Sequence, residues 1–448
     1  MRMTALLLLA LSSARIPDAW AERNDCTKTV PDPGSSAPHA IQLAQAINDP
    51  NAMGDVTVCI TGTLSFGPFD WVTIQPSAAV TELAVVGVDD EAGEPATIEN
   101  GSMPLRFGGL APGSPPGAPP LPRSSLPVLR ILNLRLHHPS VGAIAIQNGN
   151  QLVEISGVHV DGVRTELVAT PDGPVPFRVG IVVQSQFYPI DGVVDISGNH
   201  VNAGSYDPAS WDALHNNLGI SVTVPFGSAD VRIEDNLVEN WAVHGIGVGA
   251  SSGVLVEHNT IAPGGFTIDH PVPVSCIGTG IFISNSVHTL VKNNHIHKEL
   301  TYAASQPEGV GPPRFCSPAV LVYWSRDNVF MGNVITGTSG YAFVLSLLFD
   351  SSAPQLPLTA DNLFLGNNTS ALELVPTSVV WRGVTRTNGT TVHLGPDAWT
   401  NVFVGGTGSV SGNQNGTNRV TGLTPVAGQI GPVVSDHLTD MIQPVFLP

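Results

Sequence analysis

Carboxylates and histidines stand at two fixed positions after a short motif that recurs along the chain. Asp161 and Glu239 lie three residues after the reference residue of their copies, and Asn202 does so in the copy between them. His159 and His200 lie one residue after it. If successive copies stack at about 4.8 Å, the backbones of Asp161 and Glu239 are about 10 Å apart. Inclined side chains then reach the spacing at which inverting glycosidases hold an acid, a base and one water. We therefore expect Asp161 and Glu239 to be the catalytic pair, assisted by His159 and His200.

Five side chains in or beside this region are candidate contacts to a substrate. Three are aromatic rings of the kind on which sugars stack, and two are polar groups that bond hydroxyls. They are Asn202, Tyr206, Trp211, Trp241 and His244. The alternative is structural: polar residues are expected on any solvated strand face, and a loop aromatic often covers the core.

The motif that sets these positions reads apolar-x-apolar-x-x-Asn-x-apolar. Residues 231–238 and 254–261 carry it as VRIEDNLV and VLVEHNTI. An apolar strand follows each copy, as in GIGVG at 245–249. Self-similarity of this kind predicts a solenoid, each turn of which is called a coil below. The reference position of the motif recurs at Leu134, Val158, Asn199, Asn236, Asn259, Asn294, Asn333 and Asn367.

The motif also predicts how each coil is arranged. Its apolar positions should face inward and stack on their copies. The asparagine should occupy a corner, where it tolerates the left-handed conformation and bonds its copies above and below. Insertions fall between the motif and the strand that follows it, so they should crowd one corner and wall a groove. They span residues 162–178, 203–217, 262–278 and 298–317.

The N-x-I…GIxV pattern resembles the right-handed parallel β-helix repeats of the pectin-lyase-like superfamily. Its tandem repeats are similar to those of NosD-like proteins and of secreted carbohydrate-active proteins, and the resemblance covers about residues 55–405. It implies an all-β solenoid of about ten coils or more. It does not imply one activity, because this fold carries lyases, hydrolases, epimerases and non-catalytic proteins. Of the polygalacturonase signatures, only fragments such as His244-Gly245 are present.

A second set of residues resembles the arrangement of chondroitinase B and alginate lyases. Glu234, Glu257 and Lys292 stand two residues before the asparagine in successive copies, with Arg232 beside Glu234. In this alternative Glu234 and Glu257 hold Ca²⁺, which neutralises a uronate, and Lys292 is the base. The competing interpretation is a ladder of cross-strand ion pairs.

A transition-metal site is a further hypothesis. His295 and His297 alternate on one strand face, and His258 lies one coil away. Imidazoles suit Zn²⁺ and Cu²⁺, but the sequence offers no obvious further ligand.

The ends of the chain predict export and two caps. Residues 1–21 have a basic start, an apolar run and a small-x-small site, as in a signal peptide. Residues 22–54 are expected to form an N-terminal cap with a helix at 40–47, and residues 406–448 a final coil and cap. Capping is needed because a bare terminal coil exposes core and strand edges.

Cysteines and charge restrict the compartment and the partners. Four cysteines in an exported chain favour two disulfides, which we assign as Cys26–Cys59 and Cys276–Cys316. A net charge of −18, with 18 basic residues against 36 acidic ones, argues against nucleic acid. No stretch is long and apolar enough to span a bilayer.

We therefore expect a secreted or periplasmic monomer that binds a polysaccharide or a cell-surface glycan, with hydrolysis the favoured chemistry. The alternatives are a non-catalytic adhesive β-helix and a Ca²⁺-dependent polysaccharide lyase. The sequence identifies no definite cofactor, and Ca²⁺ is implied by the lyase alternative.

Overall fold

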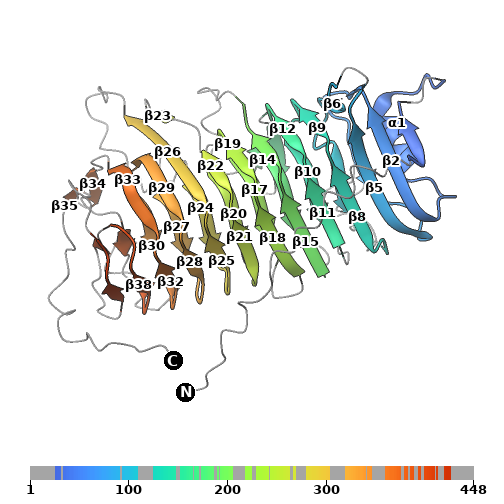
Figure 1. The fold of residues 1–448 in the computed structure, drawn as a ribbon. Helices are drawn as coiled ribbons and strands as arrows, with labels where there is room; N and C mark the ends of the chain where they lie inside the picture. The colour runs from blue at the N-terminus through green and yellow to red at the C-terminus, as the bar shows by residue number, and fades with distance from the viewer. Residues whose placement is uncertain are drawn as a thin grey trace.

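The computed structural model describes residues 26–424 apart from internal gaps, the longest of which are 109–124, 205–216, 269–278, 303–317 and 346–358. Within these residues the chain winds through three long parallel sheets, called A, B and C, in that repeating order. The coils stack in chain order, from α1 and β2 at one end to β38 at the other (Figure 1). This arrangement is a right-handed parallel β-helix, as the motif predicted.

The strands have the following bounds. Sheet A contains β1 (Lys28–Val30), β2 (Gly54–Thr61), β5 (Val80–Val88), β8 (Val128–Leu132), β11 (Leu152–Ser156), β15 (Gly192–Ser197), β18 (Ala229–Glu234), β21 (Val254–Glu257), β25 (Leu290–Lys292), β28 (Val329–Met331), β32 (Leu363–Leu365), β38 (Val402–Val404) and β40 (Arg419–Thr421). Sheet B contains β3 (Thr63–Ser65), β6 (Thr97–Glu99), β9 (Arg135–His137), β12 (His159–Asp161), β16 (His200–Asn202), β19 (Leu237–Glu239), β22 (Thr260–Ala262), β23 (Phe266–Ile268), β26 (His295–Tyr302), β29 (Val334–Ser339) and β33 (Asn368–Leu374).

Sheet C contains β4 (Val72–Ile74), β7 (Leu105–Gly108), β10 (Gly142–Gln147), β13 (Glu166–Thr170), β14 (Gly173–Gln184), β17 (Asn217–Thr223), β20 (His244–Gly249), β24 (Thr279–Ser284), β27 (Pro318–Tyr323), β30 (Tyr341–Leu345), β36 (Val392–Leu394) and β39 (Val410–Ser411). Two small sheets pair β31 (Thr359–Ala360) with β37 (Ala398–Trp399), and β34 (Ser378–Trp381) with β35 (Val384–Thr387). Parallel pairing thus includes β1, before residue 55, and β40, after residue 405.

The core follows from the alternation of each strand, because every second side chain points inward. Val231, Ile233 and Val238 are fully buried, and Val256 and Ile261 repeat them in the next coil. Aliphatic residues therefore stack on their copies along the solenoid. This confirms the inward positions that the motif predicted.

Asparagines form a hydrogen-bonded ladder at the corner between sheets A and B. Each side-chain Nδ2 donates to the Oδ1 of the next asparagine at 2.9 Å, from Asn199 through Asn236, Asn259, Asn294 and Asn333 to Asn367. The expected ladder is confirmed. The expected left-handed conformation is wrong for the asparagine itself, because it belongs to the residue before: Gly198, Asp235 and His258 have φ of 64°, 55° and 54°. That residue makes the turn and leaves the asparagine amide free to point inward.

The N-terminal end is closed by a helix and a disulfide. Helix α1 (His39–Ile47) forms over the residues predicted to be helical and buries Leu43 and Ile47 completely. Cys26 and Cys59 are bonded with Cα atoms 5.6 Å apart, which confirms that pairing. Cys276 and Cys316, like the signal-peptide segment 1–21, lie outside the described residues. No helix among the described residues is long and apolar enough to cross a membrane.

The insertions all lie between a sheet B strand and the following sheet C strand. Segment 162–178 contributes β13, which pairs antiparallel with β14. Segment 262–278 contributes β23, which extends sheet B beside β26. The four predicted insertions therefore share the corner between sheets B and C.

Candidate functional site

The outer face of sheet B carries a continuous row of polar side chains. Parallel pairing places Glu99 opposite His137, His137 opposite Asp161, Asp161 opposite Asn202, and Asn202 opposite Glu239. Asp161 and Glu239 are therefore two coils apart, as the motif spacing predicted. The row lies beside the insertion corner, and a polymer laid along the solenoid axis would contact each member in turn.

Asp161 is held by the coil before it. Its Oδ2 lies 3.2 Å from Nη2 of Arg135 and 3.7 Å from Nε2 of His137. The guanidinium fixes the carboxylate in one orientation, with one edge engaged and the side chain still 28% exposed. A partly exposed carboxylate held in this way can accept a hydrogen bond from a water.

Glu239 is bonded to a histidine of the preceding coil. Its Oε2 lies 2.7 Å from Nε2 of His200, and the His200 ring stacks on His159 with centroids 4.4 Å apart. Burial, then the nearby His200 and Arg135, lower the pKa of His159. The lowered pKa favours the neutral imidazole of His159 beneath the His200–Glu239 pair. The structure thus brings His159, His200 and Glu239 together.

Asn202 lies between the two carboxylates. Its Oδ1 accepts hydrogen bonds from the backbone N of Gly204 at 2.7 Å and from Nδ2 of Asn240 at 3.0 Å. These two donors fix the orientation of the amide, which therefore presents its own NH₂ group in a defined direction. A fixed amide between two carboxylates is well placed to bond a sugar hydroxyl.

Of the three aromatic candidates, only Trp241 lies among the described residues. Trp241 is fully buried, and its Nε1 donates to the carbonyl of Val201 at 3.0 Å. The indole belongs to the core and has no face open to a sugar. Tyr206 and Trp211 lie outside the described residues.

His244 begins β20 in sheet C, where it is half-buried. Its ring stacks on Phe282 with centroids 4.2 Å apart. Burial lowers the pKa of His244 to about 3, and the charge of Lys298 contributes to the shift. Burial also lowers the pKa of Lys298 to about 7. Burial therefore favours the neutral imidazole of His244 and, above about pH 7, the neutral amine of Lys298.

This burial predicts a loss of stability in acid. The pKa of His244 falls from 6.5 in the unfolded chain to about 3 in the fold, so below pH 6.5 the unfolded chain binds more protons and the free energy of unfolding decreases. Between pH 6.5 and 4.5 the loss from this group should be about 2 kcal/mol. In His244→Gln, the free energy of unfolding measured with a chemical denaturant should therefore fall by about 2 kcal/mol less than in the unaltered chain over the same pH range. The control is His295→Gln at an exposed position, and an unchanged pH dependence in His244→Gln would contradict the prediction.

The lyase alternative lies on a different sheet. Glu234, Glu257 and Lys292 are in register on successive strands of sheet A, as predicted. Lys292 Nζ is bonded to Glu257 Oε2 at 2.7 Å, and Arg232 to Asp230 at 2.8 Å. Burial, then repulsion from Asp195 and Glu257, raise the pKa of Glu234. Here a lysine neutralises one of the two expected Ca²⁺ ligands, as in a charge ladder.

The proposed histidine trio is not brought together. His295 and His297 both contact Oγ1 of Thr336, at 3.1 and 2.9 Å. His258 occupies the corner before the ladder and bonds Nδ2 of Asn293 at 3.3 Å. These three residues do not form a metal-binding group in the described part of the chain.

The sequence interpretation missed the first member of the row. Glu99 accepts from Nδ1 of His137 at 2.7 Å and lies 3.4 Å from Nδ1 of His138. Burial alone would raise its pKa, but hydrogen bonds and positive charge from the two histidines lower it overall. Glu99 could have been found by aligning ATIEN at 96–100 with LRLHH at 134–138. In this alignment the first residues, Ala96 and Leu134, are both buried.

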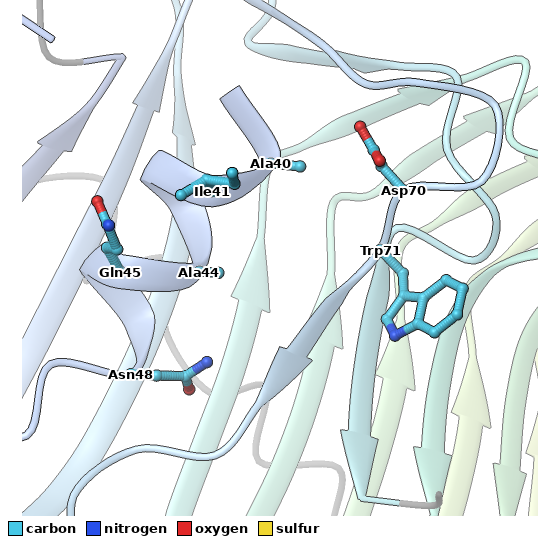
Figure 2. A pocket seen from close by; sticks show the side chains of 7 residues that line it. All are labelled: Ala40, Ile41, Ala44, Gln45, Asn48, Asp70 and Trp71. Carbon is cyan, nitrogen blue, oxygen red and sulfur yellow. The ribbon is translucent and has the colours of Figure 1, made fainter. Parts of the chain in front are cut away.

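A hollow of about 380 Å³ lies at the N-terminal end. Figure 2 shows that its lining comes from α1 and from the segment of Asp70 and Trp71 facing it. The Asn48 amide bonds the backbone of Thr73 and Gln75, and Asp70 accepts from the backbone N of Gly67. These polar groups hold the cap in place.

The chain is similar in part to one family model and to several solved structures. A family model described as a right handed beta helix region matches residues 191–391. The catalytic unit of a GH87 alpha-1,3-glucanase from Streptomyces thermodiastaticus is 12% identical, over 91% of this chain and 68% of that one, with a TM-score of 0.40. A mannuronan C-5 epimerase A-module from Azotobacter vinelandii is 11% identical, over 90% and 98%, with a TM-score of 0.32. A DFA-IIIase from Arthrobacter chlorophenolicus is 12% identical, over 89% and 99%, with a TM-score of 0.34. No curated protein sequence matches the chain.

Proposed function

We propose that this chain, a right-handed parallel β-helix of the pectin-lyase-like fold, is an exported protein that binds an extended polysaccharide along the outer face of sheet B and hydrolyses it. The observation that carries the proposal is the row from Glu99 to Glu239, in register over five consecutive coils. At about 4.8 Å per coil the row spans about 19 Å, which suits a polymer rich in hydroxyls better than a compact ligand.

The two carboxylates supply the chemistry. Their backbones are about 10 Å apart, so the carboxyl groups are compatible with the 6.5–9.5 Å separation of inverting glycosidases. Asp161, held by Arg135, is the base that activates a water. Glu239, bonded to His200, delivers the proton to the leaving oxygen. Asn202 between them orients the sugar, and the reaction inverts the anomeric centre.

Charge and compartment support the same ligand class. With 18 basic and 36 acidic residues the chain repels nucleic acid, whose binding needs clustered Lys and Arg. The Cys26–Cys59 disulfide fits an oxidising compartment outside the cytosol. A neutral glycan is the substrate that the acidic row repels least.

The test is a panel of neutral and uronate polysaccharides, incubated with the protein with and without chelator. New reducing ends without ultraviolet absorbance, on a neutral glycan, are the expected result. Unsaturated products that form only with Ca²⁺ would contradict hydrolysis and favour the lyase alternative on sheet A. Binding without any product across the panel would favour the adhesive alternative and remove the catalytic part of the proposal.

A further inference from the structure

We infer that Glu99, His137 and His138 form a binding site for a transition-metal ion of the Zn²⁺ class, here called the Glu99 site. Among the described residues, they make up a group whose ligand atoms all lie within 4.8 Å of one another. The inference does not depend on the proposed hydrolysis.

The geometry of the Glu99 site brings three donors to one point. Glu99 and His137 are directly opposite on β6 and β9, and Glu99 Oε2 lies 2.7 Å from His137 Nδ1. Glu99 Oε1 lies 3.4 Å from Nδ1 of His138, and the two imidazole centroids are 3.7 Å apart. Both Nδ1 atoms thus face one carboxylate, and an ion replacing the intervening proton would contact all three residues.

The donor set identifies the class of ion. Two imidazoles and one carboxylate suit Zn²⁺ and its neighbours, whereas Ca²⁺ and Mg²⁺ prefer oxygen ligands alone. The side chains of Glu99, His137 and His138 are 30%, 28% and 41% exposed, so an ion can enter from solvent. Three protein ligands leave a coordination position open, as in catalytic and not structural zinc sites.

A second layer of contacts supports the ligands. His137 turns its other nitrogen, Nε2, toward Asp161 Oδ2 at 3.7 Å, and Arg135 holds Asp161 at 3.2 Å. Carboxylates behind metal-bound histidines orient the ring and raise the basicity of the ligand, and at 3.7 Å the Asp161 charge acts on the imidazole without a direct hydrogen bond. Asp161 is thus a positioning residue for this site.

The backbone is shaped for the His138 ring. His138 is left-handed, with φ 53°, and its backbone N donates to the Asp161 carbonyl at 2.8 Å. A Cβ on Gly162 would lie 2.5 Å from His138 Cδ2, so only glycine leaves room for the imidazole there. The ring is therefore confined beside His137.

The test uses the full chain after removal of metal with chelator. Titration with Co²⁺, followed by visible d–d absorption, and competition with Zn²⁺ should reveal one tight site per chain. Glu99→Gln and the double variant His137→Ala/His138→Ala should each weaken binding at least 100-fold. Asp161→Asn should weaken it 10- to 100-fold, as second-layer partners do. Circular dichroism checks that each variant is folded.

The matched control is His258→Ala. His258 is also a left-handed corner histidine near two carboxylates, with Glu257 Oε1 at 3.4 Å and Asp235 Oδ1 at 4.0 Å, but among the described residues it belongs to no three-ligand group. Its removal should leave the tight site unchanged. Tight binding that survives in the folded double variant, or equal loss in His258→Ala, would overturn the inference, as would the lack of a tight site in the unaltered chain.

Discussion

Asp161→Asn should lower the rate of glycan hydrolysis about a thousandfold while leaving glycan affinity within a few-fold of the unaltered chain. Asparagine has nearly the same shape but cannot accept the proton of the attacking water, and general base catalysis contributes about 10²- to 10⁴-fold. The measurements are the release of reducing ends at saturating glycan and calorimetric binding. Full activity in this variant would remove Asp161 from the mechanism.

A matched control for this variant exists on the neighbouring sheet. Asp230 also pairs with an arginine, Arg232, at 2.8 Å, so Asp230→Asn removes a comparable ion pair without touching sheet B. Its hydrolytic rate should equal that of the unaltered chain. Glu239→Gln should match the loss seen in Asp161→Asn, and it keeps the Glu99 site intact. Assays of both variants in chelator then separate a failed catalytic pair from a failed metal site.

Asn259→Ala should lower the free energy of unfolding by about 4 kcal/mol. The Asn259 amide is fully buried, donates to Asn294 and to the carbonyls of Ile233 and Glu257, and accepts from both the backbone and the side chain of Asn236. Each buried group left without a partner costs about 1–3 kcal/mol, so several at once exceed an ordinary truncation. Equilibrium denaturation with urea measures the difference.

The end of the ladder provides the comparison. Asn199 is preceded by Val158, which occupies the same position without an amide and is equally buried. Asn199→Val extends this apolar coil and should cost about 2 kcal/mol, because fewer buried groups lose a partner. Equal losses in the two variants would show that the ladder acts as separate bonds and not as a connected chain.

Much of the architecture could be predicted because each copy of the motif keeps the same internal spacing, although the copies lie 23 to 41 residues apart. The inward aliphatic positions, the asparagine ladder and the register of Asp161 with Glu239 all follow from counting residues from the reference position within each copy. The contact partners of those side chains could not be predicted from the sequence. Whether Asp161 turns toward Arg135 or toward Glu239 depends on its side-chain rotamer and on the residues of the preceding coil. The repeated motif determines neither.

Trp241 shows the same limit. Its position after Glu239 predicted a ring at the corner, open to substrate. The indole instead turns inward because Gly180 and Gly219 leave space for it: a Cβ on either would lie within 3.2 Å of the ring. These glycines lie within β14 and β17, the sheet C strands of the two preceding coils. The space for the Trp241 ring therefore depends on residues far apart in sequence, and no local sequence pattern predicts it.

The asparagine ladder also gives the solenoid a dipole along its axis. Every Nδ2 from Asn199 to Asn333 donates to the Oδ1 of the following coil, and a second ladder from Asn328 to Asn418 donates in the same sense. The amide dipoles therefore add along the axis and polarise one another. Their oxygen ends face the first coils and their hydrogens the last. A duplicated coil that carried the asparagine would lengthen this dipole, whereas one without it would divide the dipole into two independent halves.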